Sequence, residues 1–208
     1  TMLLGRNGAG KTTTLRTIMG LWHASKGRIA FDGNDITAQD TPHIAGLNIA
    51  YVPENMGIFA DLTVKENMLL AARSAKRASQ MDDARLKWIF TLFPPVEKFW
   101  NHPAGKLSGG QKQMLAVARA IVEPRDLLIV DEPSKGLAPA IINNMIDAFA
   151  QLKATGTTIL LVEQNINFAK RLGDNVAVMD NGQVVHAGSM KALAEDEELQ
   201  KSLLGLAI

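Results

Sequence analysis

Short runs of apolar residues recur along this sequence and are separated by segments in which apolar residues follow helical spacing. Four of these runs are rich in Leu, Ile and Val: 2–4, 47–52, 127–130 and 158–162. Nearly uninterrupted apolar runs are typical of strands that are buried on both faces, as in a parallel sheet. Two further runs, 176–179 and 183–187, flank Asn181-Gly182, which predicts a β-hairpin. We therefore expect an α/β fold on a mostly parallel sheet.

Between these runs, several segments have the features of amphipathic helices. Segment 12–21 follows the first apolar run and is predicted to be helical. Another helix begins at Pro139, and its apolar face is a core stripe of Ile142, Met145, Ile146, Phe149 and Leu152. Thr41-Pro42 is typical of a helix start, with Thr41 as the N-cap and proline at the first helical position. Ahead of it, Arg28–Phe31 alternates as a half-buried strand does, before a turn at Asp32-Gly33.

The strand-like runs disappear between residues 55 and 122. A capping box at Thr63–Glu66 predicts a helix that extends to about Ser74. A second helix is expected over 82–93, stopped by Pro94-Pro95. We interpret 55–122 as a helical subdomain inserted into an α/β core that is made by 1–54 and 123–208, so that 1–208 forms a single domain.

Composition narrows the classes of protein that remain. The formal net charge is +1, which argues against a broad basic surface for nucleic acid. The chain has no cysteine, so disulfides and thiol chemistry are excluded. No apolar run approaches the roughly 18 residues that cross a bilayer, so any membrane role is expected to come through a partner.

The stretch Gly5–Thr13 fits the pattern G-x-x-x-x-G-K-[ST] of a phosphate-binding loop. Its backbone N–H groups and the positive end of the following helix favour an anion. Lys11 is predicted to reach the β- and γ-phosphates of a nucleoside triphosphate, and the Thr12 hydroxyl to ligate Mg²⁺. The predicted nucleotide-binding residues of this loop are Asn7, Gly8, Ala9, Gly10, Lys11, Thr12 and Thr13. An incidental glycine-rich turn is the alternative, and the order of strand, loop and helix argues against it.

Two acidic residues follow the apolar run 127–130. Asp131 and Glu132 come at the carboxyl end of a predicted buried strand, where α/β proteins bind ligands. Asp131 is predicted to hold Mg²⁺ through water, and Glu132 to polarise an attacking water. The alternative is a turn with solvated charges. Two adjacent carboxylates after a fully buried strand fit a metal–phosphate site better.

A second candidate phosphate-binding segment is Ser108-Gly109-Gly110-Gln111. Ser108 and Gln111 form the pattern of a capping box at the start of a helix. The two glycines also permit close approach of a phosphate to that helix N-terminus. Taken alone, these residues leave a plain capped helix and a phosphate-binding segment equally open.

In this order, Gly5–Thr13, Leu107–Gln111 and the strand that ends at Asp131-Glu132 resemble the ATP-binding subunits of ABC transporters, over essentially the whole chain. The finer resemblance is to the ATPases of branched-chain amino acid uptake systems. It rests on four segments: Val52-Pro53-Glu54, Ser134–Pro139, Leu161–Asn165 and Ser202–Leu206. Importers of urea or short amides share much of this pattern. The resemblance implies the P-loop NTPase fold of an ABC ATPase with an inserted helical subdomain.

The resemblance also implies a two-chain machine that binds ATP and Mg²⁺. Two ATPase subunits, identical or different, are expected to face head to tail, with each ATP between one phosphate loop and the partner's Ser108 and Gly110. Glu54 stands where the family usually has a glutamine and is expected to ligate Mg²⁺. Gln164 stands where the family usually has a histidine and is expected to donate to the γ-phosphate as a catalytic residue. The expected partners are permease subunits, with the ATPase peripheral at the cytoplasmic face of the inner membrane and no nucleic acid bound.

Two other classes of protein carry the same motifs. DNA-repair ATPases share them but insert a long coiled coil, and the gap from Lys11 to Ser108 lacks sustained heptads. A module that senses ATP without turnover is disfavoured because the expected hydrolytic side chains are present.

Only four residues precede the phosphate loop, so we expect an N-terminally truncated chain. The aromatic residue that stacks on adenine in the family lies upstream of this loop, and no adenine platform is assigned.

Overall fold

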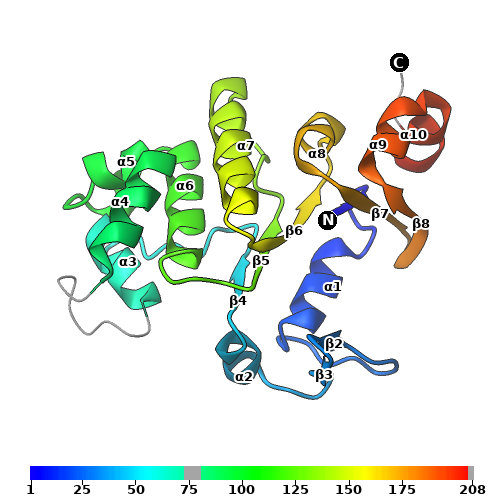
Figure 1. Cartoon of the computed structure of the whole chain (residues 1–208), viewed down its shortest axis with the longest axis horizontal. Coiled ribbons are helices and arrows are strands. Elements are labelled where there is room, and N and C mark those ends of the chain that lie inside the picture. The colour runs from blue at the N-terminus through cyan, green and yellow to red at the C-terminus, as the bar shows by residue number, and fades with distance from the viewer. Residues whose placement is uncertain (73–80, 206–208) are drawn as a thin grey trace.

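The computed structural model describes residues 1–72 and 81–205 as strands that alternate with helices (Figure 1). The strands are β1 (Met2–Gly5), β2 (Ala30–Phe31), β3 (Asn34–Asp35), β4 (Ile49–Val52), β5 (Leu127–Asp131), β6 (Thr158–Glu163), β7 (Asn175–Asp180) and β8 (Gln183–Ser189). The α-helices are α1 (Lys11–Ile18), α2 (Thr41–Gly46), α3 (Val64–Ala71), α4 (Asp83–Leu92), α5 (Pro94–Lys98), α6 (Gly109–Ala120), α7 (Pro139–Ala154), α8 (Ile166–Leu172), α9 (Met190–Glu195) and α10 (Glu197–Leu204). A short 3₁₀ helix, η2 (Ala104–Lys106), precedes α6.

The main sheet has six strands in the order β4-β5-β6-β1-β7-β8. Five of these strands run parallel, and β8 pairs with β7 antiparallel across Asn181-Gly182. The predicted mostly parallel sheet and the predicted hairpin are both confirmed. Strand β1 lies between β6 and β7, with Leu3 in register with Val162 on one side and Ala177 on the other. The loop that follows β1 therefore leaves from the middle of the sheet.

Apolar side chains on the two faces of the sheet pack into two separate clusters. Leu4, Val130 and Leu161 belong to the larger cluster, which includes residues of α7 and α8. Leu3 and Ile129 belong to the smaller cluster, which includes residues of α1. This alternation along each strand explains why the runs are apolar throughout, since both faces are covered. Figure 1 shows α7 and α8 on one side of the sheet and α1 on the other.

Helices α3 to α6 lie together at one end of the molecule (Figure 1). Thr63 caps α3 through the predicted capping box, with the Thr63 N–H donating to Glu66 Oε2 at 2.8 Å. Buried residues of these helices, such as Leu92 and Leu115, belong to the same cluster as the sheet residues Leu128 and Val130. The predicted end of the first of these helices, near Ser74, lies outside the described residues. The division into a core and an inserted helical subdomain stays a prediction.

Several predicted boundaries are wrong by a few residues, each for a local reason. Helix α1 ends at Ile18 rather than Leu21, and Gly20 follows with a φ of 67°. Helix α2 has Asp40 as its N-cap, not Thr41, because the Asp40 carboxylate accepts from the His43 N–H at 3.0 Å.

Two further elements differ from the prediction near turns. The expected strand 28–31 is only Ala30–Phe31, because it pairs with the two residues of β3 across Asp32-Gly33. Pro94-Pro95 ends α4 as predicted but also begins α5. Proline fits the first turn of a helix, where its missing N–H has no intrahelical partner to lose.

Candidate functional site

The loop between β1 and α1 has a backbone that requires glycine at three positions. A Cβ at Gly5 would lie 2.5 Å from the carbonyl oxygen of Met179 on β7. Gly8 and Gly10 have φ values of 81° and 99°, in the left-handed region that favours glycine. Behind the loop, the Gly182 N–H donates to the Ala9 carbonyl at 2.9 Å and joins the β7–β8 turn to it. The loop is thus held in place by the sheet that carries it.

A cavity of about 240 Å³ lies against this loop. Its walls are the loop and α1 residues Asn7, Gly8, Ala9, Gly10, Lys11, Thr12 and Thr13, together with Glu54, Glu132 and Lys135. The cavity adjoins the N-terminal end of α1, where helix N–H groups favour an anion. All seven predicted residues of the loop therefore border one space of a size that suits phosphate groups.

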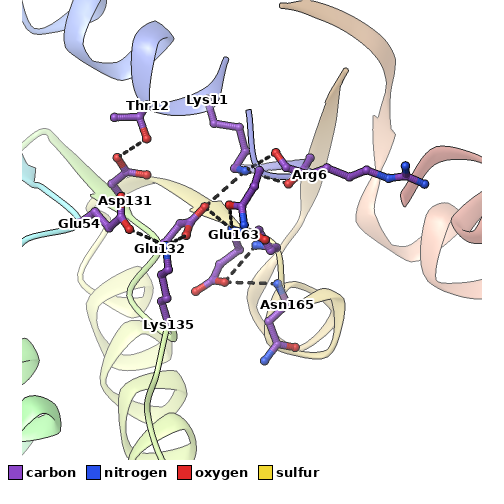
Figure 2. A network of polar contacts seen from close by, with 12 residues as sticks. Arg6, Lys11, Thr12, Glu54, Asp131, Glu132, Lys135, Glu163 and Asn165 are labelled. Carbon is purple, nitrogen blue, oxygen red and sulfur yellow. Dashed lines mark hydrogen bonds and ion pairs between the residues drawn. The ribbon is translucent and has the colours of Figure 1, made fainter. Parts of the chain in front are cut away.

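Lys11 is the buried cation of this cavity, with 4% of its surface exposed. Its Nζ donates to the Gly5 carbonyl at 2.8 Å and to the Arg6 carbonyl at 3.0 Å. It also forms an ion pair with Glu132 Oε1 at 3.3 Å. The loop carbonyls therefore hold the Lys11 ammonium at the cavity wall, facing the carboxylate that follows β5 (Figure 2).

Asp131 ends β5 and lies beneath Thr12. The Thr12 hydroxyl donates to Asp131 Oδ2 at 2.9 Å, while Asp131 Oδ1 is buried and has no hydrogen-bond partner among the described residues. Burial raises the pKa of Asp131, and the charges of Glu132 and Glu54 act in the same direction. A buried carboxylate oxygen without a partner, next to a hydroxyl, suits a hard cation that takes oxygen ligands, such as Mg²⁺.

The metal-binding role of Glu54 has no direct geometric support. Within residues 1–72 and 81–205, no three His, Cys, Asp or Glu side chains gather to form a metal cage. Glu54 Oε1 is instead 2.5 Å from Lys135 Nζ. Ligation by Glu54 stays a prediction.

Glu132 has an uncommon backbone conformation for a residue other than glycine, with a φ of 49°. Its N–H donates to the Val162 carbonyl at 2.9 Å, and its side chain is 8% exposed. Burial acts to raise the pKa of Glu132, but the Gln164 amide and the charge of Lys11 outweigh it, so that the pKa lies below its ordinary value. The carboxylate is therefore ionised near neutral pH and able to accept a proton.

Gln164 connects Glu132 to the phosphate loop. Its Nε2 donates to Glu132 Oε1 at 2.7 Å and to Asn7 Oδ1 at 2.6 Å. The predicted residues Asn7, Glu132 and Gln164 are thus in direct contact although they come from three distant parts of the chain. Beside Asn7, the Arg6 side chain points away from the cavity, and its Nε donates to the Leu204 carbonyl of α10 at 3.3 Å (Figure 2).

Two residues of the site, Glu163 and Ser134, had no predicted role. The buried Glu163 carboxylate accepts from the Ser134 N–H and from the Ser134 hydroxyl, each at 2.9 Å. It also accepts from the N–H groups of Gln164 and Asn165, at 3.2 Å and 3.4 Å. Glu163 therefore ties the loop after Glu132 to the loop that carries Gln164. The sequence offered one signal, a glutamate directly after the apolar run 159–162.

The segment Ser108–Gln111 lies outside the walls of this cavity. Its capping box is confirmed: the Ser108 N–H donates to Gln111 Oε1 at 2.9 Å, and the Gln111 N–H donates to Ser108 Oγ at 3.3 Å. A Cβ at Gly110 would lie 2.8 Å from the Ile141 side chain, so this glycine lets α6 approach α7 closely. The part of the chain that the structure describes brings this segment into no contact with the phosphate loop, and its binding role stays a prediction.

Known proteins resemble this chain in sequence and in fold. The sequence pattern of the family described as ABC transporter matches residues 1–135. The high-affinity branched-chain amino acid transport ATP-binding protein BraG of Pseudomonas aeruginosa is 37% identical over 205 residues, covering 98% of this chain and 86% of that protein. The probable branched-chain amino acid transport ATP-binding protein LivF of Archaeoglobus fulgidus is 36% identical over 207 residues, covering 99% of this chain and 87% of that protein. A solved ATP binding subunit of an ABC transporter has a TM-score of 0.78 at 28% identity, covering 98% of this chain and 84% of that one.

Proposed function

Because this chain belongs to the ABC transporter family, we propose that it is the ATP-hydrolysing subunit of an importer of branched-chain amino acids. The ATPase activity follows from the family. The assignment of residues to steps and the choice of substrate are the proposal. The chain of contacts from Lys11 through Glu132 to Gln164 and Asn7 carries it, since these contacts place a cation, a carboxylate and an amide around the phosphate cavity.

In the proposed mechanism, the loop N–H groups and Lys11 bind the β- and γ-phosphates of ATP. Glu132 accepts a proton from the attacking water, and its lowered pKa keeps it ionised for this step. Gln164 holds Glu132 in place with one hydrogen of its amide, and the other hydrogen exchanges Asn7 for the γ-phosphate when ATP binds. Phosphoryl transfer depends mostly on positioning and on electrostatic stabilisation, and these contacts supply both.

We propose Thr12 and Asp131 as the residues that hold Mg²⁺, with Glu54 as a further candidate. The partnerless Asp131 Oδ1 and the adjacent Thr12 hydroxyl support this assignment. A Mg²⁺ ion held there would offset the negative charge of the phosphates. The protein contributes the orientation of the two oxygen ligands.

We further propose that the working unit is a pair of ATPase subunits bound to permease subunits. The fold supports this, because ABC ATPase cassettes work as dimers with permease components, and the partner's Ser108–Gln111 is then available to complete each ATP site. No helix of residues 1–72 and 81–205 is long and apolar enough to cross a membrane. The proposed location is the cytoplasmic face of the inner membrane, reached through the permeases.

The substrate is tested by transport in reconstituted vesicles. The ATPase is purified with its membrane partners, and ATP-driven uptake of leucine, urea and a short amide is compared in one preparation. We expect leucine uptake that depends on ATP and Mg²⁺, because the BraG and LivF proteins are named for branched-chain amino acid transport. If the vesicles take up urea or the amide but not leucine, the protein is the ATPase of one of the related importers.

The catalytic assignment is tested by Glu132→Gln in the same complex. This change keeps the size of the side chain but removes the proton acceptor, so we expect ATP to bind while phosphate release falls by about a hundredfold or more. Hydrolysis at the wild-type rate by the Glu132→Gln complex would show that Glu132 is not the base.

A further inference from the structure

Lys135 lies in the loop between β5 and α7 and borders the phosphate cavity. Its side chain is 52% exposed, and its ammonium group contacts two carboxylates. Lys135 Nζ is 2.5 Å from Glu54 Oε1 and 3.4 Å from Glu132 Oε2. Figure 2 shows Lys135 extending toward Glu54 and Glu132 from the opposite side to Lys11. One cation therefore joins the loop after β4 to the proposed catalytic carboxylate.

The two oxygens of Glu132 have different partners. Oε1 accepts from the Gln164 amide at 2.7 Å and pairs with Lys11 at 3.3 Å. Oε2 pairs with Lys135. Lys11 and Gln164 hold Oε1, and Lys135 adds a contact on Oε2, so the three side chains together restrain the rotation of the carboxylate about its last bond. A general base must lie within hydrogen-bond reach of the proton that it removes, so this rotation affects catalysis.

The charge balance at the cavity gives Lys135 a second role. Glu54, Asp131 and Glu132 bring three carboxylates to a place that must also accept the phosphates of ATP. Lys11 is engaged with Glu132 and with two loop carbonyls. Lys135 contacts Glu54 and offsets a negative charge that repels phosphate.

We propose that Lys135 is a positioning residue that pairs with Glu54 and orients Glu132, so that the state of the Glu54 loop is transmitted to the catalytic carboxylate. The inference rests on the proposed role of Glu132. Exposed ion pairs contribute little to folding stability, so the effect of Lys135 is expected in turnover and not in unfolding. Movement of the Glu54 loop away from the cavity withdraws a partner of Lys135 and leaves Glu132 Oε2 less constrained.

The test measures kcat and KM for ATP hydrolysis in the assembled complex with the variants Lys135→Gln, Lys135→Arg, Glu54→Gln and Lys135→Gln/Glu54→Gln. Lys191→Gln is the control, because Lys191 makes an exposed ion pair with Glu195 on α9, at 3.9 Å. We expect Lys135→Gln to lower kcat by about tenfold with a smaller change in KM, because misplacement of a catalytic group acts on the chemical step. Lys135→Arg retains most of the activity, and Lys191→Gln behaves as wild type.

The double variant separates the possible roles of Lys135. If Lys135 offsets Glu54, removal of both charges restores part of the kcat that Lys135→Gln loses. A double variant that loses kcat by the product of the two single losses would overturn the link to Glu54, because independent effects multiply, and wild-type kinetics of Lys135→Gln would overturn any role in turnover. Glu132→Gln is measured alongside. Full activity of Glu132→Gln would overturn the proposed function as well, whereas its inactivity together with an unaffected Lys135→Gln would overturn this inference alone.

Discussion

The bond between Ser134 and Glu163 gives a sharp test of how the catalytic loops are held. The Ser134 hydroxyl donates to Glu163 Oε2 at 2.9 Å, and both residues are buried. Ser134→Ala removes this hydroxyl and adds no bulk, so the change leaves the rest of the fold in place. The Ser134 N–H still donates to Glu163 Oε1, so the variant isolates a single hydrogen bond.

The expected loss of stability in Ser134→Ala follows from the charge and the burial of the Glu163 carboxylate, which accepts the bond. A hydrogen bond to a charged group contributes about 1.5–3 kcal/mol to stability, and loss of one partner leaves the buried carboxylate less satisfied. We expect Ser134→Ala to lower the free energy of unfolding by about 2 kcal/mol. For a chain of this size, that corresponds to a fall in Tm of about 4–8 °C.

The same bond predicts a dependence on pH. Burial raises the pKa of Glu163, while the hydrogen bonds from Ser134 act against it. Because the folded-state pKa lies above the ordinary value, the folded protein holds more protons than the unfolded chain between these two values. The contribution of Glu163 to stability therefore decreases as pH rises through that window. Ser134→Ala raises the folded-state pKa further, so its cost is larger at neutral pH than in acidic buffer.

Urea unfolding of the wild type and Ser134→Ala at several pH values measures both effects. Thr91→Ala is the control, because the exposed Thr91 hydroxyl donates to the Trp88 carbonyl on α4 at 2.7 Å, and we expect a change within about 0.5 kcal/mol. A Ser134→Ala variant as stable as Thr91→Ala would refute the view that Glu163 holds this loop. A loss of stability in Ser134→Ala that does not change with pH would refute the role assigned to the charge of Glu163.

Three further substitutions test other parts of the fold and the site. Gly5→Ala places a Cβ 2.5 Å from the Met179 carbonyl, so we expect nucleotide titration to report weaker ATP binding; unchanged affinity would mean that the loop tolerates a side chain there. Ser108→Ala removes the cap of α6 and is expected to cost about 1 kcal/mol in urea unfolding, whereas Ser108→Asn keeps most of it. Phe149→Ala opens a cavity beside Phe168, at 6.3 Å between ring centroids, and is expected to lower the free energy of unfolding by about 3–5 kcal/mol; a loss below about 1 kcal/mol would mean that the site repacks.

Local patterns predicted much of the fold because strands, turns and helix caps depend on residues that are close together in the sequence. The apolar run 127–130 and the pair Asn181-Gly182 carry enough information for a buried strand and for a hairpin. The capping boxes at Thr63 and Ser108 are also local and were predicted correctly. The start of α2 was missed by one residue because Asp40 and Thr41 are both good caps, and the sequence does not decide between neighbours.

The contacts inside the site could be predicted only in part. The motifs predicted Lys11, Asp131 and Glu132, because loop and strand patterns mark where these residues stand in an α/β fold. Ser134 and Glu163 are 29 positions apart, and Lys135 is 81 positions from Glu54. Contacts at such separations depend on how three loops meet at one edge of the sheet, and the pattern of residues within a single segment does not predict them.

The position of β1 has a consequence for how this protein is made. The strand that carries the phosphate loop, β1, lies at residues 2–5, yet its two neighbours in the sheet are β6 and β7, at residues 158–163 and 175–180. During synthesis, Met2, Leu3 and Leu4 leave the ribosome long before either neighbour exists, and contacts of this sequence separation form slowly. Until β6 and β7 have been synthesised, the nascent chain carries β1 without these two partners. We expect it to acquire affinity for ATP only after both strands have emerged.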